Sequence, residues 1–122
     1  MPELRGGVLA MGRSQRDKGK RGEREALAHL RAVWGFDGGH RSAQVDGRLS
    51  SDLVLPASGL HPEVKFYKGI AALRFLEQAE RDAQEGEVPF VVMRENGDKR
   101  WALMLRAADL PTLIERLMRC TP

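Results

Sequence analysis

Apolar residues recur every three or four positions in three stretches of the chain, which is the spacing of one helix face. The first stretch follows a weak capping signal at Ser14 and runs to Trp34, and Gly35 ends the predicted helix. The other two stretches cover residues 70–84 and 109–119. The pattern therefore predicts three helices, one near each end and one in the middle.

Short apolar runs between these helices predict strands. The runs Asp52–Leu55 and His61–Tyr67 flank a turn that contains glycine, and we expect them to pair as a hairpin. Residues 90–94 and 101–105 flank an Asn-Gly pair, which is a strong signal for a second hairpin. The long Gly- and Ser-rich loop before the first hairpin contains one further predicted strand, around residues 40–44.

The order of these elements predicts an α/β fold with one central mixed sheet and flanking helices. A chain of 122 residues can form one real core but not two, so we expect a single domain over residues 14–122. Residues 1–13 contain three glycines and a proline without a sustained apolar period. They are predicted to form a flexible, basic N-terminal arm.

Charge is distributed unevenly along the chain. Residues 1–24 hold seven of the 20 cationic side chains and only three of the 17 acidic ones, whereas the net charge of the whole chain is +3. Such a segment can bind phosphate groups, and it can equally be a solvated tail. No apolar run approaches the ~20 residues of a membrane span, and no signal peptide is recognisable. With Cys120 as the single cysteine, these features predict a cytoplasmic protein without an intrachain disulfide.

Several ionisable residues occupy positions on predicted strands and helices that suggest a role beyond solvation of the surface. In a strand over residues 61–67, Glu63, Lys65 and Tyr67 share one face. Asp52 opens a strand that continues with apolar residues, and burying its charge without a partner would be costly. A metal ion is one such partner.

Helix geometry adds a third carboxylate. Glu23 shares a stripe with Leu27 and Leu30, whereas Glu25 is rotated about 200° away and lies with His29. We therefore expect Glu23 to face the sheet and Glu25 to face solvent. Three carboxylates near one lysine form an oxygen-rich site that suits Mg²⁺, or Mn²⁺ in its place.

Such a site suits phosphodiester hydrolysis, because a metal lowers the pKa of the attacking water and neutralises the phosphate oxygens. Lys65 would orient or deprotonate the nucleophile, or stabilise the developing charge. Each part also has a structural interpretation: a surface ion pair of Glu63 with Lys65, a turn ending at Asp52, and a bond from Glu23 to Lys20 or Arg24.

The ordered motifs resemble those of the archaeal-type Holliday junction resolvases and their phage relatives, within the PD-(D/E)xK nuclease superfamily. The resemblance covers about residues 18–92 and depends on the following segments: Lys18-Gly19, Gly22-Glu23-Arg24-Glu25, Arg41-Ser42, Ser51-Asp52-Leu53-Val54 and Glu63-Val64-Lys65. It implies a restriction-endonuclease-like fold and a Mg²⁺ site with Glu23, Asp52, Glu63 and Lys65 in the active centre. Ala26 and the loop Ala43–Arg48 depart from the family pattern, and the second departure bears on junction recognition.

The resemblance implies a homodimeric, structure-selective endonuclease that cuts branched DNA at four-way junctions. It implies neither binding to a membrane nor a small-molecule substrate. Symmetric nicks need two active sites related by a two-fold axis. The apolar stripe of the last helix is a candidate dimer surface and equally a candidate core face. The expected DNA-binding residues are Arg13, Arg16, Lys18, Lys20, Arg21, Arg24, Arg41, Ser42 and Lys68. A nuclease for flaps or duplex ends, and a DNA-binding module that does not cut, remain the alternatives.

Overall fold

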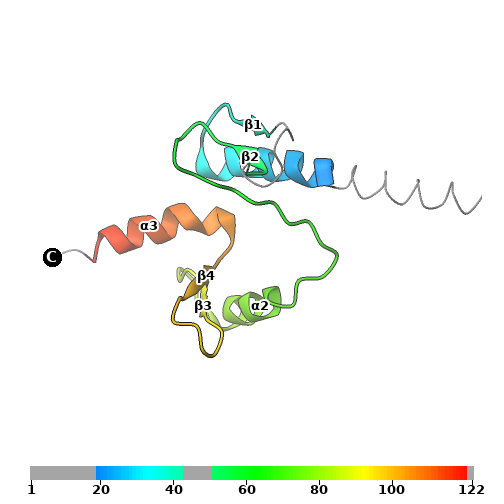
Figure 1. Ribbon diagram of the computed structural model, residues 1–122. Coiled ribbons are helices and arrows are strands. Elements are labelled where there is room, and N and C mark those ends of the chain that lie inside the picture. Colours follow the sequence, from blue (N-terminus) through cyan, green and yellow to red (C-terminus); the bar gives the residue numbers. More distant parts are fainter. Residues whose placement is uncertain (1–18, 43–50, 121–122) are drawn as a thin grey trace, which may run out of the picture. The chain divides into compact units, whose positions relative to one another are not determined.

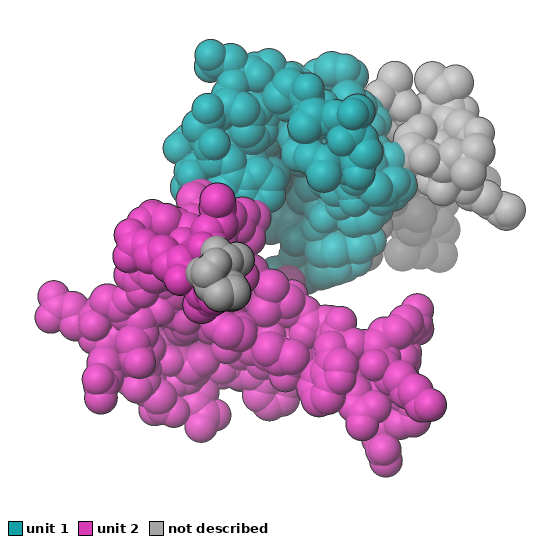
Figure 2. Space-filling model, turned by 90° about the vertical axis from the view of Figure 1, so that its left-hand side faces the viewer, with its two compact units in different colours: residues 1–67 teal, residues 68–122 magenta. Residues whose placement is uncertain are grey.

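The computed structural model describes residues 19–42 and 51–120 (Figure 1). Within these residues the chain is mixed α/β, with three α-helices and two small antiparallel sheets. The chain divides into two compact units, residues 1–67 and 68–122 (Figure 2). The predicted N-terminal arm and the predicted helix start at Ser14 lie outside the described residues.

The first helix, helical over residues 19–34 of the described chain, ends where its sequence predicts. Gly35 has a φ of +72° and donates its backbone N–H to the carbonyl oxygen of Arg31 at 3.0 Å. Glycine reaches this left-handed conformation at little cost, which is why it commonly follows a helix. The Arg31 guanidinium then donates to the carbonyl oxygens of Gly38 and Gly39, each at 2.8 Å. These bonds fix the loop that leads from the helix into the first strand.

The first sheet lies beside this helix and contains β1 (His40–Arg41) and β2 (Leu53–Val54). The strands are antiparallel, with His40 opposite Val54 and Arg41 opposite Leu53. The side chains of Leu27 and Leu53 are the buried hydrophobic groups among the described residues of this unit. Asp52 directly precedes the buried Leu53, as predicted, but the strand is not buried throughout, because Val54 is exposed.

The predicted pairing of Asp52–Leu55 with His61–Tyr67 as a regular hairpin is wrong. β2 pairs with β1 instead, and residues 61–67 form no regular strand. One backbone bond does join the two segments, from the N–H of Asp52 to the carbonyl oxygen of Pro62 at 2.9 Å. Pro62 has no N–H to return, and the N–H of Val64 donates to the Asp52 side chain at 2.7 Å. The hydrogen bond from Val64 to the Asp52 side chain therefore takes the place of the backbone ladder that a regular hairpin would have.

A close contact joins the first helix to this irregular segment. A Cβ atom at Gly22 would lie 2.7 Å from Cδ1 and 2.8 Å from Cβ of Phe66. Only glycine fits at this distance without displacing one of the two segments. Gly22 therefore determines how close Glu23, the next residue of the helix, comes to the segment that carries Lys65.

We expect Gly22→Ala to destabilise the protein although alanine favours helix. The gain in helix propensity is about 1 kcal/mol, whereas overpacking of this kind costs about 1–3 kcal/mol. Thermal unfolding would measure the difference. Gly19→Ala is the matched control, because the space around Gly19 is open. In a Phe66→Gly background, which removes both the ring and the Cβ atom of residue 66, the Gly22→Ala change should lose its cost; a persistent loss of stability there would contradict the contact.

The second unit contains α2 (Leu73–Asp82), the strands β3 (Val91–Met93) and β4 (Ala102–Met104), and α3 (Leu110–Met118) after the 3-10 turn η1 (Ala107–Asp109). The predicted hairpin is confirmed: β3 pairs antiparallel with β4, and Val92 lies opposite Leu103. Gly97 has a φ of +93°, which the turn between the strands requires. Leu76 and Leu113 are buried.

The helix α2 is shorter than predicted. Residues 71–72 form a turn in which the N–H of Leu73 donates to the carbonyl oxygen of Ile70, so α2 begins three residues later. The described residues also form two separate two-stranded sheets rather than one continuous mixed sheet. The predicted α/β class is confirmed, while the single central sheet is not present in this part of the chain.

An ion pair links α2 to the chain before η1. The Arg106 guanidinium donates two hydrogen bonds to the Glu80 carboxylate, each at 2.9 Å. These bonds hold the pKa of Glu80 below its usual range and raise the pKa of Arg106. A carboxyl group with a lowered pKa stabilises the fold above its unfolded-state pKa, and this contribution is lost as the pH falls through the lowered value.

We therefore expect Glu80→Gln to lower the melting temperature at pH 7, and the gap to the wild type to close as the pH falls below about 4.3, the ordinary glutamate range. Melting curves between pH 7 and pH 2 would test this. Glu115→Gln is the control, because Glu115 pairs with Arg119, one turn along the chain from it. A gap that stays constant down to the lowest pH would argue against the linkage.

Among residues 19–42 and 51–120, none of the helices combines the length and the apolar character that a membrane span requires.

Candidate active site

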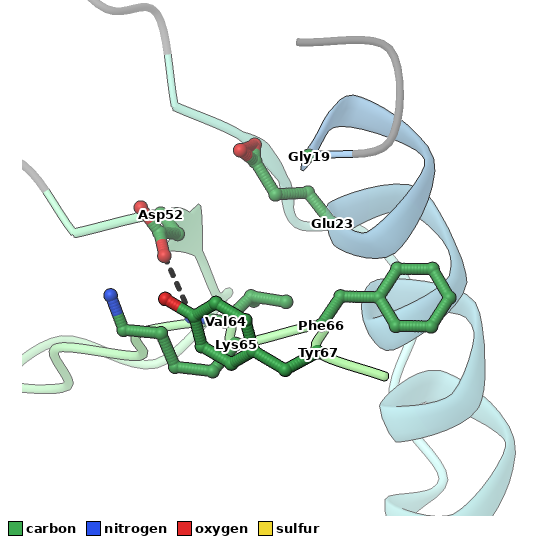
Figure 3. A pocket seen from close by; sticks show the side chains of 7 residues that line it. All are labelled: Gly19, Glu23, Asp52, Val64, Lys65, Phe66 and Tyr67. Atoms are coloured by element: carbon green, nitrogen blue, oxygen red, sulfur yellow. Dashed lines mark hydrogen bonds between the residues drawn. The ribbon is translucent and has the colours of Figure 1, made fainter. Parts of the chain in front are cut away.

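A pocket of about 480 Å³ lies in the first unit between the first helix, the start of β2 and the irregular segment (Figure 3). Its lining residues are Gly19, Glu23, Asp52, Val64, Lys65, Phe66 and Tyr67. Three of the four predicted active-site residues thus surround one pocket: Glu23, Asp52 and Lys65. They come from three segments that are far apart in the sequence.

Asp52 is held on both sides by neighbouring segments. Its N–H donates to the carbonyl oxygen of Pro62, and its own carbonyl oxygen accepts the N–H of Ser42 at 3.1 Å. Its side-chain Oδ2 accepts the N–H of Val64 at 2.7 Å (Figure 3). Because Oδ2 is occupied and the backbone is fixed, the carboxylate has a defined orientation. No bond to Oδ1 is formed by the described residues, so this oxygen remains available to a ligand.

Two serines support the same strand entrance. The Ser42 hydroxyl donates to the carbonyl oxygen of Ser51, and the Ser51 hydroxyl donates to the carbonyl oxygen of Leu53 at 2.6 Å. Ser42 was expected to contact DNA. In the structure its hydroxyl and its N–H are both bonded to the chain around Asp52, so it positions the strand that carries the acid.

The predicted phase of the first helix is confirmed. Glu23 is half-buried and lines the pocket, and Figure 3 shows its carboxylate reaching from the helix toward the side where Asp52 lies. Glu25 is exposed and lies 3.9 Å from the Arg21 guanidinium. Glu23 and Glu25 are only two positions apart, yet they lie on different faces of the helix, so Glu23 lines the pocket and Glu25 faces solvent.

Lys65 and Tyr67 contribute the polar groups of the irregular segment. Both side chains are exposed and line the pocket. In Figure 3 the Lys65 amino group and the Tyr67 hydroxyl lie on the same side of the segment as Asp52. The described carboxylates form no ion pair with Lys65, so the surface ion pair with Glu63 is not formed.

Glu63 is the predicted active-site residue that does not line the pocket. Its Oε1 lies 3.0 Å from Nε2 of His61, and the side chain is 47% exposed. The predicted position of Glu63 beside Lys65 assumed that residues 61–67 pair with β2, and that pairing is not formed. Accordingly, the described residues contain no group of three acidic, histidine or cysteine side chains arranged for a metal ion.

The two carboxylates of the pocket still fit Mg²⁺. This ion commonly takes one or two carboxylates from the protein and completes its octahedron with water and substrate phosphate oxygens. Asp52 Oδ1 and the Glu23 carboxylate are hard oxygen donors on one pocket. A soft, thiolate-binding metal would find no ligand among these residues.

The predicted DNA-binding residues differ in their settings. Lys20, Arg21 and Arg24 are exposed on the first helix, and the Arg21 guanidinium lies 5.4 Å from the centre of the Phe66 ring. Arg41 is half-buried, and its buried Nη1 has no hydrogen-bond partner among the described residues. Lys68 is exposed in the second unit. Arg13, Arg16 and Lys18 lie outside the described residues.

Sequence reasoning placed Tyr67 on the face of Lys65 but did not select it as a site residue. Its two-residue spacing from Lys65 was the available signal, and the pocket now includes it. Gly22 and Phe66 were not predicted to touch, because nothing in the sequence indicates which glycine a distant ring packs against.

Comparisons of the chain with protein-family models, with curated proteins and with solved structures found no match.

Proposed function

We propose that this chain is a Mg²⁺-dependent, structure-selective DNA endonuclease of the PD-(D/E)xK type that resolves four-way junctions. One observation carries the proposal: Glu23, Asp52 and Lys65 meet at one pocket although they come from a helix, a strand entrance and a separate segment. Two acids and a lysine around an open pocket suit hydrolysis of a phosphodiester better than they suit a purely structural role.

In this proposal the Asp52 and Glu23 carboxylates would hold the metal, and the metal would make a water more acidic and neutralise phosphate oxygens. Water would add across the bridging P–O bond: its oxygen bonds to phosphorus as that bond breaks, and the proton that the water releases to solvent balances the proton that the departing oxygen takes up. Lys65 directs its ammonium group toward the reacting phosphate and either orients the nucleophile or stabilises the negative charge that develops there. The hydrogen bond from Val64 keeps the Asp52 carboxylate in place throughout.

Cations near the pocket support DNA as the substrate. The exposed Lys20, Arg21 and Arg24 stand on the helix that carries Glu23, where they can bind the backbone phosphates on either side of the cut.

Selectivity for junctions and a homodimer belong to the same proposal. Two active sites related by a two-fold axis can cut two strands symmetrically where four arms meet. The test below separates two alternatives from this proposal. A related nuclease could act on flaps or duplex ends with the same pocket. A module that binds DNA without cutting it is favoured by the position of Glu63 outside the pocket.

The test is incubation of the purified protein with labelled four-way junction, matched duplex and flap, with Mg²⁺ and with EDTA. We expect Mg²⁺-dependent, paired nicks in the junction and a dimer by light scattering. Equal cutting of flaps or ends would limit the proposal to a nuclease of this type. Binding without cleavage in Mg²⁺ or Mn²⁺ would identify the non-cutting module.

The two glutamates of the first helix provide an internal comparison. We expect Glu23→Gln to reduce the cleavage rate strongly, by about 10- to 100-fold or more, because it removes a charge from the metal-binding pair. Glu25→Gln should change the rate little, because Glu25 is exposed and away from the pocket. Single-turnover rates would measure both. Similar losses in the two variants would contradict the assignment of Glu23 to the site.

A further inference from the structure

A second pocket, of about 530 Å³, lies within the second unit between α2 and the turn of the β3–β4 hairpin. The residues of interest in its lining are Phe75, Arg94, Glu95, Asp98, Arg100 and Trp101. None of them is used by the proposed active site. The volume falls in the range of roughly 300–1,000 Å³ that small-molecule sites have.

Two aromatic residues line this pocket, and both are exposed to solvent. Phe75 is 60% exposed and Trp101 is 64% exposed. The guanidinium of Arg94 lies over the Trp101 ring, 5.0 Å from the centroid. Such a contact holds a flat side chain in place. The pocket therefore offers rings on which a planar ligand can stack.

The charged groups of the pocket compensate one another. Asp98 forms an ion pair with Arg100 at 2.8 Å, and this pairing holds the Asp98 pKa below its usual range. Arg94 donates to the carbonyl oxygen of Asp98 at 2.8 Å. With Glu95 as the second acid, the lining carries two cations and two anions. A phosphate or a free cation is therefore a poor match, whereas a neutral planar ligand with donors and acceptors on its edge is a good one.

We propose that this pocket binds an unpaired nucleobase, stacked on Trp101, such as one that a branched DNA substrate exposes when base pairs at the branch point open. A nucleobase is neutral, flat and edged with both donors and acceptors, which Glu95 and the arginines can pair with. Stacking on aromatic side chains tolerates any base sequence, as a structure-selective enzyme requires. The inference rests on the proposed function, because it is the proposed nuclease activity of the first pocket that identifies DNA as the ligand.

The experiment measures the affinity of a labelled single-stranded oligonucleotide and of a duplex of equal length by fluorescence anisotropy. It uses the Asp52→Asn protein in EDTA, so that cleavage does not enter. Trp101→Ala should weaken single-strand binding by roughly 5- to 150-fold, the range for one lost base–aromatic stack, and leave duplex binding nearly unchanged. Trp101→Phe should retain most of the affinity. Leu103→Ala is the matched control, because Leu103 is 51% exposed on β4 but does not line the pocket.

Tryptophan fluorescence gives a second measurement that does not depend on an alanine variant. The single strand should quench Trp101 emission, and this quenching should be absent in Trp101→Phe. Unchanged single-strand affinity in Trp101→Ala, or equal weakening on duplex and single strand, would overturn the proposal. The proposal would also be overturned if Trp101→Ala converted a dimer to a monomer without loss of single-strand affinity. That result would show that a second copy of the chain, and not a nucleobase, occupies the pocket. A wild-type protein that binds single strands through Trp101 but cuts no substrate would overturn the nuclease assignment alone.

Discussion

Asp52→Asn should abolish cleavage while the protein remains folded and bound to DNA. Loss of an outer-shell partner of a metal ligand typically costs ~10- to 100-fold, and the loss of a ligand charge should exceed this. Asparagine keeps an acceptor for the N–H of Val64, which now donates to Oδ2 at 2.7 Å. The substitution therefore removes the charge with little effect on the local hydrogen bonds. It also removes an anion near the phosphates, so DNA binding should be equal or tighter.

Two comparisons make this expectation decisive. Asp37→Asn is the matched control, because Asp37 is an exposed acid of the same unit that does not line the pocket. Asp52→Ala should lose cleavage and also thermal stability, because it leaves the Val64 amide without its acceptor. Cleavage rates, melting temperatures and junction affinities would be measured for all three. An Asp52→Asn enzyme with near-normal turnover would remove the proposed metal site.

Lys65→Met should reduce the cleavage rate by about 100- to 1,000-fold, which is the usual effect of losing one preorganised charge-stabilising group. Methionine keeps the aliphatic stem and removes the ammonium group. Mg²⁺ or Mn²⁺ binding, measured by calorimetry, should be retained, because the proposed ligands are Asp52 and Glu23. Lys99→Met, a change at an exposed lysine outside the pocket, should have no such effect on the rate.

Lys65→Arg separates proton transfer by this lysine from roles that need only its positive charge. An arginine keeps a positive charge but does not release a proton near neutral pH. Partial activity in this variant would identify charge stabilisation, whereas activity as low as that of Lys65→Met would identify proton transfer or a strict need for the lysine geometry. A Lys65→Met rate equal to that of the wild type would exclude either role.

Local patterns were sufficient for the helices and for the second hairpin. The end of the first helix at Gly35 and the exposure of Glu25 follow from helix period and from glycine conformation, which depend on neighbouring residues only. The Asn-Gly turn likewise determines the pairing of β3 with β4. The placement of Glu23 and Asp52 beside buried leucines could be anticipated for the same reason.

Glu63 shows where local patterns fail. Its predicted face assumed an extended strand paired with β2, but β1 takes that partner and Pro62 cannot complete a ladder. The Asp52 carboxylate accepts the Val64 N–H in place of a backbone carbonyl, and Glu63 lies against His61 instead of lining the pocket. Competition between possible strand partners is a long-range property, and single-segment periodicity contains no information about it.

Local sequence patterns were enough to select the residues that could carry chemistry, the helical phase that separates Glu23 from Glu25, and the turns at Gly35 and Gly97. These features depend on interactions within a few residues. The folded chain was needed to show that Glu23, Asp52 and Lys65 share a pocket, that Glu63 does not line it, and that Phe66 packs on Gly22. Those outcomes depend on which distant segments approach one another, and packing distances and hydrogen-bond competition in the folded chain set that approach.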